Sequence, residues 1–164
     1  MYDLHNLGWH SFQQLCLTIA REIFGQTVES FLDSSDAGRD GAFTGTWRPS
    51  QGEALNGRFV IQCKFTSKHD KNLRRSDLKD EVQKTKRLVL GGRCDCYILM
   101  TNAGLSGPIA EDIEKIFKGA GVKQVALFGY TWICQTIQGN KRLRMLVPRL
   151  YGLGDLSQIL VNLH

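Results

Sequence analysis

The sequence lacks the features of an exported or membrane-bound protein. Its first residues, Met-Tyr-Asp-Leu-His, show no charged region followed by an apolar core, so no signal peptide is expected. No apolar run approaches the roughly 20 residues that are needed to span a bilayer. The five cysteines are odd in number and mostly lie within apolar runs, unlike the paired framework of a secreted domain. We therefore expect reduced thiols and a cytoplasmic protein.

Several common site motifs are also missing. The four histidines (His5, His10, His69 and His164) are scattered and have no zinc-like spacing, so the sequence predicts no histidine-centred site. Gly91-Gly92 is not followed by Lys and then Ser or Thr, so no phosphate-binding P-loop is predicted. Internal repeats and low-complexity tracts are absent as well.

The positive charge of the chain is unevenly distributed. The 164 residues carry 21 Lys and Arg against 16 Asp and Glu, which gives a net charge of +5. The excess is concentrated between residues 64 and 93. Such a local excess suits a phosphate backbone, and the alternative is a solvated helix face. The side chains that we expect to contact DNA are Arg74, Arg75, Lys84, Lys86 and Arg87.

Hydrophobic periodicity predicts an α/β fold with a mixed central sheet flanked by helices on both faces. The predicted helices cover residues 8–24, 76–90 (with Ser76 as N-cap), 106–118 and 131–138. The predicted strands cover residues 26–32, 41–47, 58–66, 94–101 and 122–128. We expect one domain over residues 1–146.

The pattern changes after Leu146. Residues 147–153 contain Pro148 and Gly152, and four leucine and isoleucine side chains then form an apolar stripe that runs to the last residue: Leu156, Ile159, Leu160 and Leu163. Two interpretations of residues 147–164 remain open. They form either a C-terminal helix that packs on its own domain or a linker toward a following domain.

Two separate segments supply polar side chains suited to phosphodiester hydrolysis. Asp40 precedes a predicted strand, and Gln62 and Lys64 interrupt the next, otherwise apolar, strand. Because side chains alternate along a strand, Gln62 and Lys64 point to the same face. Hydrolysis needs a hard divalent cation held by oxygen ligands and a second positive charge near the phosphate. Asp40, the Gln62 amide and the Cys63 backbone carbonyl can bind the cation, and Lys64 supplies the charge. The alternative is an ordinary solvent-exposed face.

Asp40 followed by Gln62-x-Lys64 resembles the Mrr-type branch of the PD-(D/E)xK nuclease superfamily, in which Gln often replaces the second acid of the motif. The resemblance covers roughly residues 8–130 and implies a restriction-endonuclease-like fold. It takes in three further segments: Phe12-Gln13 in the first helix, the turn Asp36-x-Gly38-x-Asp40-Gly41, and the strand that ends in Met100-Thr101-Asn102.

The resemblance implies a Mg²⁺- or Mn²⁺-dependent endonuclease that cuts DNA, double-stranded in our expectation. Asp40 is then the main metal ligand, Gln62 a second ligand and Lys64 the catalytic lysine. Family members commonly add a Glu from the first helix, where this sequence has Gln13, and Glu22 on the same helix is the alternative ligand. Two rival interpretations are a catalytically degraded nucleic-acid-binding module of the same fold, and an interaction domain whose terminal helix docks other subunits.

A second resemblance concerns the C-terminal part. Thr131-Trp132-Ile133, Arg142-x-Arg144 and residues 147–152 (Val-Pro-Arg-Leu-Tyr-Gly) are similar to the junction between an N-terminal nuclease effector and an NTPase module. Bacterial STAND-type antiviral NTPases have that layout. The resemblance implies a role in anti-phage defence, fused NTPase or sensor domains, and activation by homo-oligomerisation.

Overall fold

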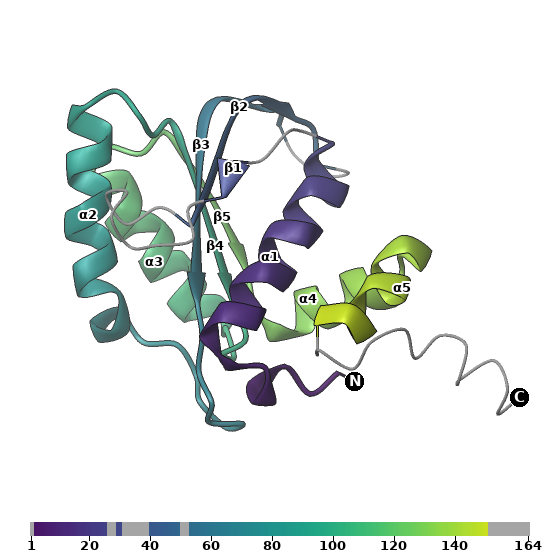
Figure 1. Ribbon diagram of the computed structural model, residues 1–164. Coiled ribbons are helices and arrows are strands. Elements are labelled where there is room, and N and C mark those ends of the chain that lie inside the picture. Colours follow the sequence, from purple (N-terminus) through teal and green to yellow (C-terminus); the bar gives the residue numbers. More distant parts are fainter. Residues whose placement is uncertain (1, 26–28, 31–39, 50–52, 151–164) are drawn as a thin grey trace, which may run out of the picture.

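Figure 1 shows a computed structural model of the chain, which describes residues 2–25, 29–30, 40–49 and 53–150. The helices are η1 (Leu4–Asn6), α1 (Gly8–Phe24), η2 (Arg75–Leu78), α2 (Lys79–Leu90), α3 (Gly107–Gly119), α4 (Tyr130–Gln138) and α5 (Lys141–Leu150), with η marking 3-10 helices. The strands are β1 (Glu29–Ser30), β2 (Gly41–Trp47), β3 (Leu55–Lys64), β4 (Cys96–Thr101) and β5 (Gln124–Phe128). In these ranges no helix is both long enough and apolar enough to cross a membrane.

The strands form one mixed sheet in the order β1-β2-β3-β4-β5. The first three strands pair antiparallel, whereas β3, β4 and β5 run parallel to one another. Helices α1, α4 and α5 cover one face of the sheet, and α2 and α3 cover the other (Figure 1). The predicted fold class, a mixed sheet with helices on both faces, is therefore confirmed.

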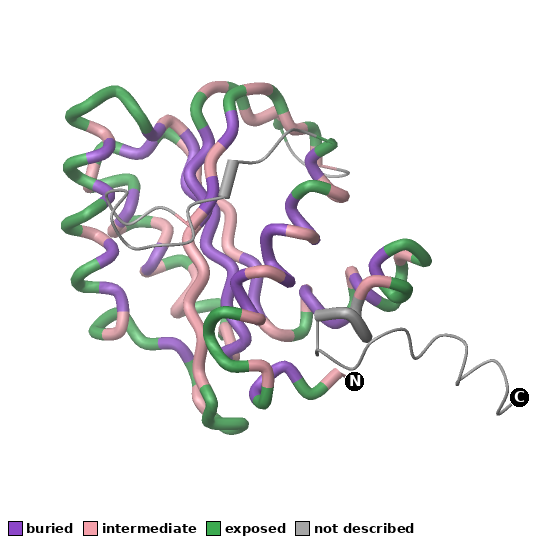
Figure 2. The backbone as a smooth tube through the Cα atoms, in the orientation of Figure 1, coloured by how far each residue is buried: buried purple, intermediate pink, exposed green. Residues whose placement is uncertain are grey.

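Alternating side chains of β3 divide the core into two layers. Phe59 and Ile61 pack with α1, and Val60 packs between the sheet and helices α2 and α3. Figure 2 shows the buried residues gathered along the sheet and on the helix faces turned toward it. Burying one such side chain contributes about 1.5–3 kcal/mol. The same alternation directs Gln62 and Lys64 to the α2 side.

The register of the β2–β3 hairpin is held by an aromatic pair. Phe43 lies opposite Phe59 in the ladder, and their rings stack at 4.3 Å between centroids. Such a pair adds about 0.5–1.5 kcal/mol beyond its buried area. A slip by one residue would turn both rings to the other face of the sheet, so the pair fixes which residue of β3 faces Asp40.

The structure differs from the sequence prediction at several element ends. The second helix begins as η2, one turn before α2, and Ser76 is not its N-cap: the Asp77 carboxylate accepts the backbone N–H of Arg74 at 2.9 Å. Strand β3 begins at Leu55, three residues before the predicted start at residue 58, because the ladder pairs Leu55 with Trp47.

Helix α5 was not predicted, and it runs across the expected domain boundary at residue 146. Residues 29–30 are the described part of the strand expected over 26–32. The apolar stripe that begins at Leu156, like Asp36 and Gly38 of the expected turn, lies outside the described residues.

Candidate active site

Strand β3 extends beyond its antiparallel neighbour β2. The ladder between them ends where Gly41 faces Ile61, and the backbone N–H of Asp40 donates to the Ile61 carbonyl at 3.0 Å. On its other side β3 stays paired with β4 as far as Lys64, opposite Thr101. Within the described ranges, residues 62–64 therefore have a strand partner on the β4 side alone. The side chain of Asp40 turns into this open edge.

The Asp40 carboxylate collects three hydrogen bonds at the edge. Oδ2 accepts the side-chain amide of Gln62 at 3.0 Å and the backbone N–H of Cys63 at 2.7 Å. Oδ1 accepts the side-chain amide of Gln13, which comes from α1 on the opposite face of the sheet, at 3.1 Å. Three of the residues singled out in the sequence, Asp40, Gln62 and Gln13, thus form one contiguous array.

Burial makes Asp40 harder to ionise. It raises the pKa of this carboxyl group from the usual 3.8 to about 6. The N–H of Cys63 and the positive charge of Lys84 oppose the rise, and the negative charge of Glu81 adds to it. A cation next to a buried carboxylate stabilises its ionised form. The array is therefore suited to hold a positive ion.

Lys64 contacts a residue that the sequence reasoning did not select. Its ammonium donates to Oε1 of Glu81 on α2 at 2.9 Å. Glu81 is 8% exposed, and its second oxygen, Oε2, has no hydrogen-bond partner in the part of the chain that the structure describes. The sequence contains a pattern that points to Glu81. Glu81, Thr85 and Leu88 have the spacing of a buried helix face, where a lone acid is unusual.

A second polar group is buried close to this ion pair. The Tyr97 hydroxyl on β4 is fully buried, and burial raises its pKa well above the usual value. The negative charges of Glu81 and Asp40 raise that pKa further. Tyr97 is thus a buried polar residue whose ionisation the charges of Glu81 and Asp40 oppose.

The loop that follows Lys64 is fastened to the end of β4. The Thr66 backbone N–H donates to the side-chain oxygen of Asn102 at 2.8 Å, and the Asn102 amide donates back to the Thr66 carbonyl at 2.7 Å. Asn102 is 1% exposed, so both bonds are protected from water. This clamp holds the end of β3, and with it Lys64, against β4.

Cys63 contributes its backbone to the site and its side chain to the core. The side chain packs against the α1 layer, and all five cysteines of the chain are free thiols, as predicted. In a strand, the N–H and the C=O of one residue point toward the same neighbour. Because the Cys63 N–H points to Asp40, its carbonyl lies on the same edge, as expected for a backbone ligand.

Glu22, the alternative ligand on the first helix, is not brought to this array. It lies nine residues after Gln13, about 13.5 Å farther along the helix axis. Its carboxylate accepts the Asn140 amide at 3.5 Å and pairs with Arg142 at 3.6 Å. The side chain thus faces the α4–α5 region, and Gln13 is the residue of α1 that contacts Asp40.

The five basic residues expected to contact DNA are exposed: Arg74 directly precedes η2, Arg75 begins it, and the other three lie on α2. They do not share one face of α2. At 3.6 residues per turn, Lys84 and Lys86 lie about 200° apart around the helix axis. Lys84 follows Glu81 by three residues and its charge reaches Asp40, so it lies on the flank next to the array. Lys86 lies on the opposite flank, and Arg87 points outward between them.

The residues around Asp40 fit a hard divalent cation. Their available donor atoms are a carboxylate, two side-chain amide oxygens and a backbone carbonyl, the oxygen ligands that Mg²⁺ and Mn²⁺ prefer. The amide nitrogens of Gln13 and Gln62 face Asp40 in this structure. A half turn of each terminal amide exchanges its nitrogen for its oxygen. Among the described residues of the array Asp40 is the one carboxylate, and the negative charge of Glu81 acts on it from α2.

The sequence of residues 4–128 matches a protein-family model described as Mrr_cat, restriction endonuclease. The match runs from η1 to the end of β5 and contains the whole array around Asp40, together with Lys64 and Glu81. A search of curated proteins finds no match.

Proposed function

The chain belongs to the restriction endonuclease family described as Mrr_cat, and we propose from this that it is a metal-dependent endonuclease that hydrolyses phosphodiester bonds of double-stranded DNA. Asp40, Gln62 and Lys64 are its proposed catalytic residues. One observation carries the proposal: the Gln62 amide and the Cys63 N–H converge on the Asp40 carboxylate beside Lys64, at the open end of β3. A family match alone would not select these atoms.

Asp40 holds a Mg²⁺ or Mn²⁺ ion in this proposal, together with the amide oxygen of Gln62 and the carbonyl of Cys63. Gln13 contributes its amide oxygen, directly or through water. A divalent cation bound there supplies positive charge next to the scissile phosphate and lowers the pKa of the attacking water. Because Asp40 is the single carboxylate among the described residues of the array, the DNA phosphate completes the charge balance, and we expect weak cation binding without DNA.

Lys64 meets the negative charge that develops on the phosphate. Its ammonium is a compact, three-donor cation on a flexible stem, so its position depends on what holds it. The 2.9 Å contact with Glu81 keeps it on the α2 side of the edge. We assign Glu81 as a positioning residue for Lys64. Lys84 and Arg87 on α2, with Arg74 and Arg75 at the start of η2, contact the DNA backbone, and Lys86 contributes least.

Cleavage of supercoiled plasmid in Mg²⁺ tests the assignment. We expect Asp40→Ala and Lys64→Ala to lower the rate by about 10²–10³-fold or more. Glu81→Gln should lower kcat by about 10–100-fold, as for other positioning residues around a metal, and leave DNA affinity unchanged. Lys68→Ala removes an exposed lysine four residues after Lys64 and serves as the matched control, with cutting unchanged.

A rival function has one observation in its favour. Glutamine occupies both position 13 and position 62, so one carboxylate contacts the proposed cation. A degraded site that binds nucleic acid without cutting would have this composition. DNA binding by the wild-type chain with no Mg²⁺- or Mn²⁺-dependent cleavage would support this binding module and overturn the nuclease assignment. Undiminished cutting by Asp40→Ala would locate the chemistry elsewhere.

We also propose a setting for this activity. The free thiols suit the reducing cytoplasm, and the C-terminal resemblance favours an effector joined to NTPase or sensor domains in anti-phage defence. In that setting assembly of several chains switches cutting on. Fusion of the chain to a dimerising partner tests activation by assembly separately from the catalytic residues.

A further inference from the structure

Folding brings together three metal-binding side chains that are far apart in the sequence. Asp3 and His5 flank the start of η1, and His69 lies in the loop between β3 and η2. One ligand atom from each of the three residues lies within 4.8 Å of the other two. The sequence predicted no histidine-centred site because the two histidines are separated by 63 residues, far more than the short ligand spacings of zinc fingers.

The geometry is close to that of a metal site. A four-coordinate zinc ion with bonds of about 2.0–2.1 Å holds its ligand atoms about 3.3 Å apart. The Nε2 atom of His69 and the Oδ1 atom of Asp3 are already 3.2 Å apart. The rings of His5 and His69 lie 4.6 Å apart between centroids, at 31° to each other. Small rotations of two exposed side chains, Asp3 and His69, would close the remaining distance.

His5 anchors the cluster. It is 7% exposed, and its ring packs against Tyr130 at 5.3 Å between centroids, whereas Asp3 and His69 keep about half or more of their side-chain surface. A buried imidazole with a second imidazole and a carboxylate beside it is a ligand set for a borderline metal rather than for Mg²⁺. The cluster therefore differs in chemistry from the oxygen-only array around Asp40.

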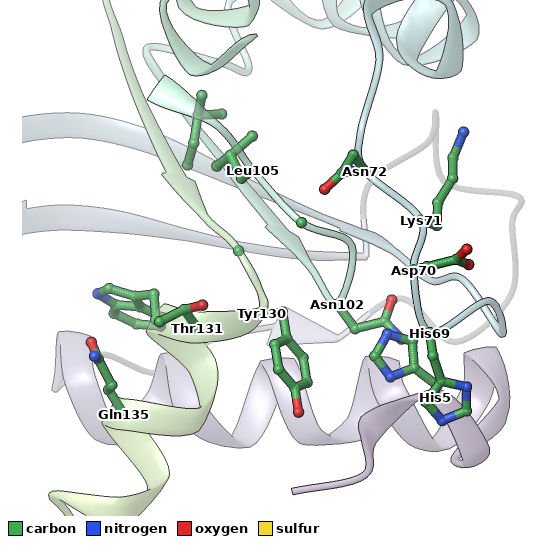
Figure 3. Close-up of a pocket in the computed structure, with 14 residues that line it drawn as sticks. His5, His69, Asp70, Lys71, Asn72, Asn102, Leu105, Tyr130, Thr131 and Gln135 are labelled. Atoms are coloured by element: carbon green, nitrogen blue, oxygen red, sulfur yellow. The ribbon is translucent and has the colours of Figure 1, made fainter. Parts of the chain in front are cut away.

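We propose that Asp3, His5 and His69 bind a Zn²⁺ ion at a site separate from the proposed catalytic centre. Three protein ligands leave a fourth position for water or for a ligand atom. His5 and His69 also line a pocket of about 410 Å³ at the carboxyl ends of β4 and β5, shown in Figure 3 with Lys71, Asn102 and Tyr130. The fourth position thus lies at the rim of this pocket, where water or a small ligand can reach it.

The ion would also join two segments. It ties the N-terminal turn to the loop that begins after Lys64 and that Asn102 already clamps at Thr66. A metal that binds the folded chain alone raises its stability by mass action. At a Zn²⁺ concentration roughly 100 times the dissociation constant, we expect the Tm to rise by about 5–10 °C.

Titration of the tag-free 164-residue chain with Co²⁺ tests the proposal, in excess Mg²⁺ to fill hard oxygen sites. We expect one equivalent of Co²⁺ to give the visible absorption of a four- or five-coordinate ion and one equivalent of Zn²⁺ to displace it. His69→Ala and Asp3→Ala should abolish the absorption and the Tm shift with little loss of folding, because both side chains are exposed.

Two variants serve as controls. His10→Ala removes an exposed histidine of α1 outside the cluster, and Asp40→Ala removes the proposed catalytic carboxylate. Both should keep the Co²⁺ absorption, so the metal test stands even if the chain proves not to cut DNA. Absence of stoichiometric Co²⁺ and Zn²⁺ binding overturns the proposal. Absorption that survives in His69→Ala, or that disappears in His10→Ala or Asp40→Ala, overturns it as well.

Discussion

At the scale of single residues, the Asp40 carboxylate combines burial with three hydrogen-bond donors, and its pKa of about 6 reflects the balance between them. The folded chain binds the proton of the Asp40 carboxyl group more tightly than the unfolded chain does, because the pKa of the unfolded chain is near 3.8. Ionised Asp40 therefore destabilises the metal-free fold. Its contribution is absent below about pH 3.8, grows as the pH rises toward 6, and is complete above that value.

Asp40→Asn removes this contribution. In the absence of metal, we expect the variant to be more stable than the wild type by at most about 3 kcal/mol near pH 8 and equally stable near pH 4. Urea unfolding in EDTA at both pH values measures the difference, with Asp70→Asn, a change at an exposed acid, as the matched control. A difference that does not depend on pH would show that burial does not penalise the charge of Asp40.

At the scale of elements, the offset between β2 and β3 creates the site. Because β2 begins opposite Ile61, three residues of β3 project past it while remaining paired to β4. Helix α1 then supplies Gln13 from one face of the sheet, and α2 supplies Glu81 from the other. Side chains from the helices on both faces of the sheet thus meet at the end of β3. Gln13 contacts Asp40 from the α1 side, and Glu81 contacts Lys64 from the α2 side.

Helix α2 also provides a test of how DNA lies on the protein. Lys84 and Lys86 carry the same charge on the same helix, but only Lys84 lies on the flank next to Asp40. Lys84→Ala should weaken DNA binding and lower the slope of log K against log salt by about 0.9, the value for one phosphate contact. Lys86→Ala is the matched control and should change neither. Equal losses in the two variants would contradict docking on the Lys84 flank.

At the scale of the whole molecule, one chain provides one proposed active site, whereas a double-strand break requires cuts in two strands. Trp9, Leu90 and Met145 are large apolar side chains that the described residues expose. We expect the rate of double-strand cutting to rise more steeply than in proportion to protein concentration. Fusion to a dimerising partner should raise it further, with nicking less affected, because assembly brings two sites together.

Supercoiled, nicked and linear plasmid are quantified against protein concentration, with and without the fusion. The fused Lys64→Ala variant controls for DNA bridging by the partner. Linearisation that stays strictly proportional to concentration and is unaffected by fusion would contradict control by assembly. That result would leave the nuclease assignment itself intact.

The sequence by itself predicted most of the helices and strands, and it singled out Asp40, Gln62 and Lys64 as candidate site residues. Helix α1 and strand β2 have the predicted bounds because periodic apolar residues and turn-forming neighbours are local signals. The period of two along β3 also sufficed to put Gln62 and Lys64 on one face, and the hairpin brought Asp40 to Gln62. Fold class and family resemblance followed from this order.

Tertiary structure alone decided which distant groups meet. It selected Gln13 over Glu22, paired Lys64 with Glu81, and brought His5 to His69. The spacing of apolar residues in the sequence indicates which side chains are buried. It does not indicate which side chain from another element lies opposite each of them. That choice depends on how the helices pack across the sheet, and the pKa of Asp40 depends on the same packing.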